Sequence, residues 1–146
     1  DKSGKEIKGI LPVKPMDLGD IVWKLNWDKG VLDPVLCINK KINTGQDITS
    51  IAGRDSDFLA LVFPEALRQI LTRIMMDESL DHNDTENNWL VFAQGQTAMH
   101  RPDEESFDDR ADYFIKVEEW VEDIVQQFSA DIGVFDRYSQ FKNQEN

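Results

Sequence analysis

The chain has 146 residues, of which 40% are hydrophobic, and a formal net charge of −12 at pH 7. This length fits one domain, and a hydrophobic content that includes four Trp and eight Phe excludes a chain that is disordered throughout. The single cysteine, Cys37, excludes an internal disulfide, and no apolar run approaches the ~20 residues of a membrane span. We therefore expect a cytoplasmic protein that makes no membrane contact.

The charges are distributed unevenly along the chain. Residues 1–41 carry a net charge of +2 and residues 42–76 a net charge of −1. Residues 77–146 contain eighteen Asp or Glu against five Lys or Arg, which gives a net charge of −13. A field polarised in this way can steer and select a charged partner, although it does not determine a fold.

The first half of the chain predicts strands. Residues 1–20 are rich in Lys, Gly and Pro, and indicate an extended basic arm ahead of the domain. Residues 21–27 alternate between apolar and polar side chains, which is the period of a half-buried strand. After turn residues, the short apolar run 35–39 indicates a second strand, antiparallel to the first. Residues 42–57 are polar and irregular, and predict a loop.

Two further apolar runs, 58–63 and 89–93, predict buried strands, although the first run could instead lead into a helix. Pro64 suits the first position of the helix that follows, which has helical apolar spacing up to Met75. The polar residues 77–88 separate this helix from the 89–93 strand.

The longest predicted helix covers residues 106–129 and has an apolar stripe at residues 114–128, and Gly133 is predicted to stop it soon after. Residues 134–141 predict a last short helix or strand, and residues 142–146 a frayed tail. The expected fold is a single α+β domain over 21–141. In it, a small, mainly antiparallel sheet of about four strands packs against two or three helices.

Motifs for catalysis or metal binding are weak in this sequence. Residues 81–86 offer oxygen ligands at the first, third and fifth positions of a calcium loop. Glu86 stands where that loop needs glycine, and Phe92 where it needs glutamate, so a polar linker is favoured. Cys37 lies within an apolar run, which predicts a buried and unreactive thiol. We therefore expect no catalytic residues, no bound metal and no cofactor.

The acidic residues of the second half are the main candidates for a binding surface. Only Arg110 and Lys116 interrupt them, although helices normally intersperse opposite charges to relieve repulsion. Solvated helix surface and a surface that binds a basic partner are both open explanations. Tyr113 and Tyr138 are further aromatic anchors if they are exposed. The predicted partner-binding residues are Asp103, Glu104, Glu105, Asp108, Asp109, Glu118, Glu119, Trp120, Glu122 and Asp123.

Three functions compete at this point. The first is a non-catalytic interaction domain, an inhibitor, an immunity-type antidote or an assembly module, that binds a basic protein. Nucleic acid is a poor ligand for the acidic half, because its phosphates would be repelled. The second is a structural domain that forms a homo-oligomer through the apolar stripe at 114–128. The third is an enzyme that uses magnesium or manganese at an acidic cluster.

Overall fold

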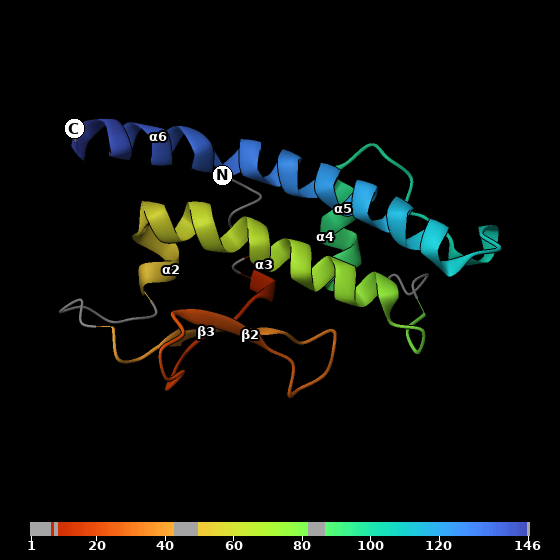
Figure 1. Cartoon of the computed structure of the whole chain (residues 1–146), viewed down its shortest axis with the longest axis horizontal. Helices are drawn as coiled ribbons and strands as arrows, with labels where there is room; N and C mark the ends of the chain where they lie inside the picture. The colour runs from red at the N-terminus through yellow and green to blue at the C-terminus, as the bar shows by residue number, and fades with distance from the viewer. Residues whose placement is uncertain (1–6, 8, 43–49, 82–86, 146) are drawn as a thin grey trace.

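The structure, a computed structural model, describes residues 7, 9–42, 50–81 and 87–145. Helices α5 and α6 form one layer, α3 lies below them, and a small sheet covers the opposite side of α3 (Figure 1). This arrangement confirms the predicted α+β class. The elements are β1 (Val13–Met16), β2 (Trp23–Asn26), β3 (Val35–Asn39), α2 (Ile51–Arg54), α3 (Ser56–Met76), α4 (Asn88–Gln96), η2 (Glu104–Ser106), α5 (Arg110–Ile132) and α6 (Val134–Glu145).

The sheet is mixed and, within the described residues, has three strands in the order β1-β3-β2. Strands β2 and β3 are antiparallel, as predicted, whereas β1 pairs with β3 in parallel. The prediction of about four mainly antiparallel strands is therefore wrong in detail. Strand β1 comes from residues 1–20; it is extended, as predicted for that stretch, but it is paired in the sheet. From the same stretch, Ile7 and Leu11 are 2% exposed and belong to the hydrophobic core.

Residues 58–63 and 89–93 are helical, which corrects the two strands predicted there. Helix α3 begins at Ser56, so Pro64 lies inside it rather than at its first turn. The Asp55 side chain caps this helix by accepting a hydrogen bond from the Phe58 backbone N–H at 2.9 Å. Asn87 caps α4 in the same way, accepting from the N–H groups of residues 89 and 90. Buried residues recur every three or four positions along α3, which places one face of it in the core.

Helix α5 starts four residues later than predicted and extends three residues further, to Ile132. It ends at Gly133, as predicted, where a left-handed φ of 67° is allowed by the absence of a side chain. The chain then continues as α6, which runs to Glu145.

The apolar stripe of α5 packs inside the molecule. The stripe residues from Val117 to Phe128 are buried, as predicted. Tyr113 and Trp120 are buried with them, whereas Phe114 is 37% exposed. Because α5 packs against α3, this stripe is not free to join a second copy of the chain. None of the helices in the described part of the chain is both long and apolar enough to cross a membrane.

We expect Gly133→Ala and Gly95→Ala to change stability in opposite directions. Alanine at Gly133 must adopt the left-handed conformation, at a cost of about 1–2 kcal/mol. Alanine at Gly95, within α4, meets no atom within 4 Å and should stabilise the fold by about 0.5–1 kcal/mol through helix propensity. Urea unfolding of both variants measures the difference, and equal effects would contradict the assignment of Gly133 as the helix stop.

Candidate partner-binding site

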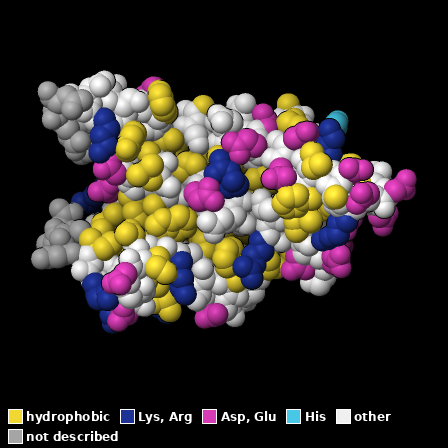
Figure 2. Space-filling model, in the orientation of Figure 1, with side chains coloured by type: hydrophobic (Ala, Val, Ile, Leu, Met, Phe, Trp, Pro, Cys, Tyr) yellow, Lys and Arg dark blue, Asp and Glu magenta, His cyan; other side chains and the backbone are white. Residues whose placement is uncertain are grey.

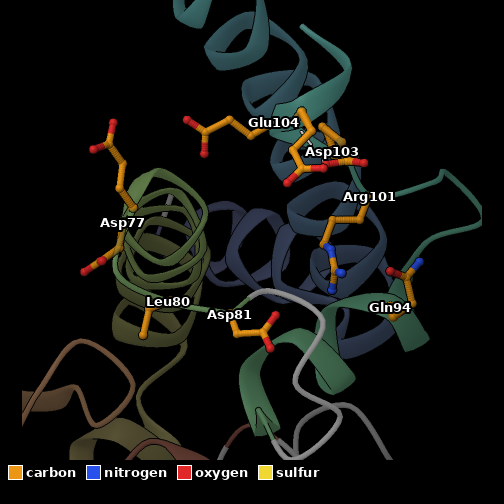
Figure 3. Close-up of a pocket in the computed structure, with 10 residues that line it drawn as sticks. Asp77, Leu80, Asp81, Gln94, Arg101, Asp103 and Glu104 are labelled. Atoms are coloured by element: carbon orange, nitrogen blue, oxygen red, sulfur yellow. Dashed lines mark hydrogen bonds between the residues drawn. The ribbon is translucent and has the colours of Figure 1, made fainter.

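Acidic side chains gather at the end of the molecule where α3 ends and α5 begins (Figure 2). They surround a hollow of about 430 Å³, which we call the acidic hollow (Figure 3). Six carboxylates from two separate segments line it, and Arg101 extends into it between Asp81 and Gln94. The lining residues are Asp77, Glu78, Leu80, Asp81, Gln94, Arg101, Pro102, Asp103, Glu104 and Glu105.

The structure brings three of the predicted binding residues, Asp103, Glu104 and Glu105, into this hollow. The other three carboxylates of the lining, from residues 77–81, were not predicted as site residues, because the sequence indicates only a polar break there. Their acidity was visible in the sequence, but their position opposite residues 103–105 depends on how α3, α4 and α5 pack.

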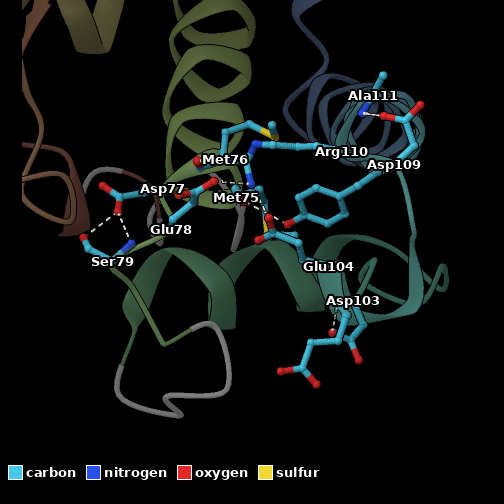
Figure 4. A network of polar contacts seen from close by, with 12 residues as sticks. Met75, Met76, Asp77, Glu78, Ser79, Asp103, Glu104, Asp109, Arg110 and Ala111 are labelled. Atoms are coloured by element: carbon cyan, nitrogen blue, oxygen red, sulfur yellow. Dashed lines mark hydrogen bonds and ion pairs between the residues drawn. The ribbon is translucent and has the colours of Figure 1, made fainter.

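Arg110 links the two segments that line the acidic hollow (Figure 4). Its guanidinium forms an ion pair with Glu104 of η2 and a second, at 2.8 Å, with Glu78 beyond α3. It also donates a hydrogen bond at 2.7 Å to the Met76 carbonyl, in the last turn of α3. One side chain at the start of α5 thus fixes both walls of the hollow and offsets part of their negative charge.

The aspartates before the two helices have a local structural role. The Asp103 side chain accepts from the Glu105 backbone N–H at 3.1 Å and caps η2. Asp109 accepts from the Ala111 N–H at 2.9 Å and caps α5 (Figure 4). Asp108 and Asp109 are exposed beside the hollow without lining it. These residues therefore shape the acidic end of the molecule as well as charging it.

The predicted acidic face further along α5 is partly neutralised within the molecule. Arg68 of α3 donates two hydrogen bonds to Glu122, at 3.0 and 3.3 Å, and also pairs with Glu65. Asp123 accepts a hydrogen bond from Thr97. The face therefore serves in part to attach α5 to its neighbours.

Two more acids lie on this side of α5. Glu119 lies 3.2 Å from Lys116, and both side chains are more than half exposed. Glu118 is exposed and forms no ion pair with a described residue. Of the four acids predicted for this face, Glu119 and Glu122 have a cationic partner, whereas Glu118 and Asp123 form no ion pair with a described residue.

The aromatic residues predicted as anchors are mostly unavailable for binding. Trp120 and Tyr113 are both 0% exposed. The Tyr113 hydroxyl donates a hydrogen bond at 2.8 Å to the Met75 carbonyl, and burial is the main cause that raises its pKa. Tyr138 on α6 is partly exposed. Exposed apolar side chains lie on both sides of the acidic segment 101–109 along the chain: Met99, at 40%, precedes it, and Phe114 and Ile115, at 37% and 51%, follow it.

The pair between Glu122 and Arg68 predicts a pH-dependent contribution to stability. Hydrogen bonding to Arg68 is the main cause that lowers the pKa of Glu122 below its ordinary value of 4.5. A lowered folded-state pKa stabilises the fold above pH 4.5, and this contribution is lost as pH falls through the lowered value. Because both side chains are more than one-third exposed, we expect Glu122→Gln to cost only about 0.2–1 kcal/mol at pH 7.

Urea unfolding at pH 7 and in acid tests this prediction. The difference between Glu122→Gln and the wild type should shrink in acid, whereas Glu118→Gln should be neutral at both pH values. A loss that is equal at both pH values would show that packing, rather than charge, is responsible.

The sequence also raised a metal loop and a thiol as candidates for chemistry. Among the described residues, no group of three or more His, Cys, Asp or Glu is placed to hold a metal ion. Asp81 is described, but residues 82–86 of the candidate calcium loop lie outside the described residues. Cys37 is 1% exposed, and burial is the main cause that raises the pKa of its thiol.

Comparison with known proteins found no matching family model, no similar curated protein and no similar solved structure. The arguments for a function therefore come from this chain's own residues.

Proposed function

We propose that this chain is a non-catalytic interaction domain whose acidic C-terminal half binds a basic protein surface. The observation that supports the proposal is the acidic hollow, where six carboxylates from two segments surround one space. Like charges repel one another, and Arg101 and Arg110 offset only part of the negative charge of these six carboxylates. Binding of a cationic group would relieve that repulsion.

The hollow suits a lysine or arginine side chain of the partner. Its carboxylates can accept charge-assisted hydrogen bonds, which are stronger than those between neutral groups. Other exposed acids of the C-terminal half, such as Asp108 and Glu118, would extend the negative field and accelerate encounter with a basic surface. Inhibitor, antidote and assembly module are all roles that such a domain could have.

Apolar contacts would supply the anchoring energy that charge alone rarely gives. Because Trp120 is buried, that role passes to Phe114 and Ile115, which are exposed near the start of α5. Together with the acids, such exposed apolar side chains would give the binding surface the mixture of apolar and charged groups that protein interfaces have.

Capture of partners from a cell lysate with three baits tests the proposal. The first bait is the wild type, and the second carries Glu105→Lys and Asp108→Lys at the acidic end. Both of these acids are exposed, and neither side chain forms a hydrogen bond or ion pair with a described residue. The third bait carries Asp20→Lys and Asp33→Lys, two exposed acids of the N-terminal half that give the same change in net charge.

A basic protein that the wild type and the Asp20/Asp33 control retain, and that the acidic-end variant loses, would support the proposal. Reversal of Glu122 is a poor test, because lysine there would face Arg68 and weaken the fold. Capture of the same proteins by all three baits, or of none by the wild type, would contradict the proposal.

A further inference from the structure

A second hollow, of about 420 Å³, lies between the end of β2 and the C-terminal half of α3. We call it the arginine–tryptophan groove. No carboxylate lines it, although the chain contains 28 Asp and Glu residues. Figure 2 shows Lys or Arg side chains beside hydrophobic ones between α3 and the sheet. The lining residues are Trp27, Arg68, Gln69, Thr72, Arg73 and Met76.

Arg73 is the distinctive residue of this groove. Its guanidinium carbon lies 4.1 Å from the centre of the Trp27 ring, which is a cation–π contact. Arg73 is exposed and forms no ion pair with a described residue. Arg68, by contrast, is already paired with Glu65 and Glu122. The ring therefore supports a planar cation whose N–H donors are still available.

The rest of the groove adds donors and an apolar floor. The indole nitrogen of Trp27 is buried, and its N–H has no acceptor among the described residues. Thr72 and Gln69 can donate further hydrogen bonds, and Met76 is apolar. The groove therefore suits a ligand with one negative, planar group on a short apolar stem.

A carboxylate fits this description better than a phosphate or a nucleic acid. A single uncompensated guanidinium matches one carboxylate, with which arginine forms two parallel hydrogen bonds. A nucleic acid, which carries one negative phosphate per nucleotide, would instead be repelled by a chain of net charge −12. We propose that the arginine–tryptophan groove binds a glutamate or aspartate side chain of an acidic partner peptide, at a site separate from the acidic hollow.

Indole N–H signals in a nitrogen–proton NMR spectrum test this proposal. The chain has four tryptophans, and Trp27→Phe identifies the signal of Trp27. The probe is a short alanine peptide that contains a single Glu and has blocked ends. The same peptide with Gln in place of Glu, and inorganic phosphate, serve as controls. We expect the Glu peptide alone to shift the Trp27 signal in a saturable way.

Arg73→Gln should lower the affinity for the Glu peptide about tenfold or more, because a charge-assisted bidentate contact is lost. Arg137→Gln, an exposed arginine on α6, makes the same charge change and should leave binding unchanged. The proposal is overturned if Arg73→Gln binds as well as the wild type, or if phosphate or the Gln peptide gives the same shift. A shift that depends on protein concentration without peptide would also overturn it, because a second copy would then occupy the groove.

Discussion

Replacement of Trp120 by alanine is expected to lower the free energy of unfolding by about 3–5 kcal/mol. The indole is 0% exposed within α5 and is among the largest fully buried side chains of the core. Small domains are stable by only about 5–15 kcal/mol, so this loss would leave a substantial unfolded fraction under mild denaturing conditions. Urea unfolding followed by circular dichroism measures the change.

Trp120→Phe is the matched control for that experiment. The indole N–H of Trp120 is buried and has no acceptor among the described residues, so phenylalanine removes an unsatisfied donor while it keeps most of the ring volume. We expect it to cost less than half as much as alanine. If Trp120→Ala unfolded like the wild type, the indole would be exposed and would again be a candidate partner anchor.

Asn39→Ala should cause the second large loss of stability, about 2–3 kcal/mol. The Asn39 side chain is buried at the end of β3, where its amide donates to the carbonyls of Gly19 and Ile21, both at 2.8 Å. Its carbonyl oxygen accepts from the Lys41 N–H at 3.0 Å. Alanine leaves these backbone groups without their partner, and it frees the connection between β1 and β2.

Asn88→Ala, at an exposed position at the start of α4, is the control for Asn39→Ala and should change stability little. Thermal or urea unfolding distinguishes the two variants. Equal stabilities would mean that the connection between β1 and β2 does not depend on the Asn39 hydrogen bonds.

Much of the fold could be predicted because its patterns are local. Alternation over residues 21–27 and the apolar run 35–39 indicated the β2–β3 pair, and Gly133 marked the end of α5. The strand predictions at 58–63 and 89–93 failed because a short apolar run does not distinguish a buried strand from a buried helix. The capping residues Asp55 and Asn87 were the signals that favoured helices. Pairing of β1 with β3 is non-local, and no local pattern predicts it.

The candidate site could be predicted only in part. Residues 103–105 were identified from their charge, whereas residues 77–81 lie opposite them only after α3 and α5 have packed. The apolar stripe was predicted to begin with Phe114, and Trp120 was predicted to bind a partner, but the buried face includes Tyr113 and Trp120 and leaves Phe114 exposed. A rotation of the helix by a fraction of a turn, which composition does not reveal, therefore decided which aromatic side chains could meet a partner.

The salt dependence of binding tests the central claim most directly. Binding of a partner captured by the wild type is measured at about 50 and 300 mM salt, which correspond to screening lengths of ~14 and ~6 Å. We predict binding that weakens markedly at the higher salt, and a much weaker, less salt-dependent complex for the Glu105→Lys/Asp108→Lys variant. Equal affinity at both salt concentrations, for the wild type and this variant alike, would show that the acidic end does not bind the partner.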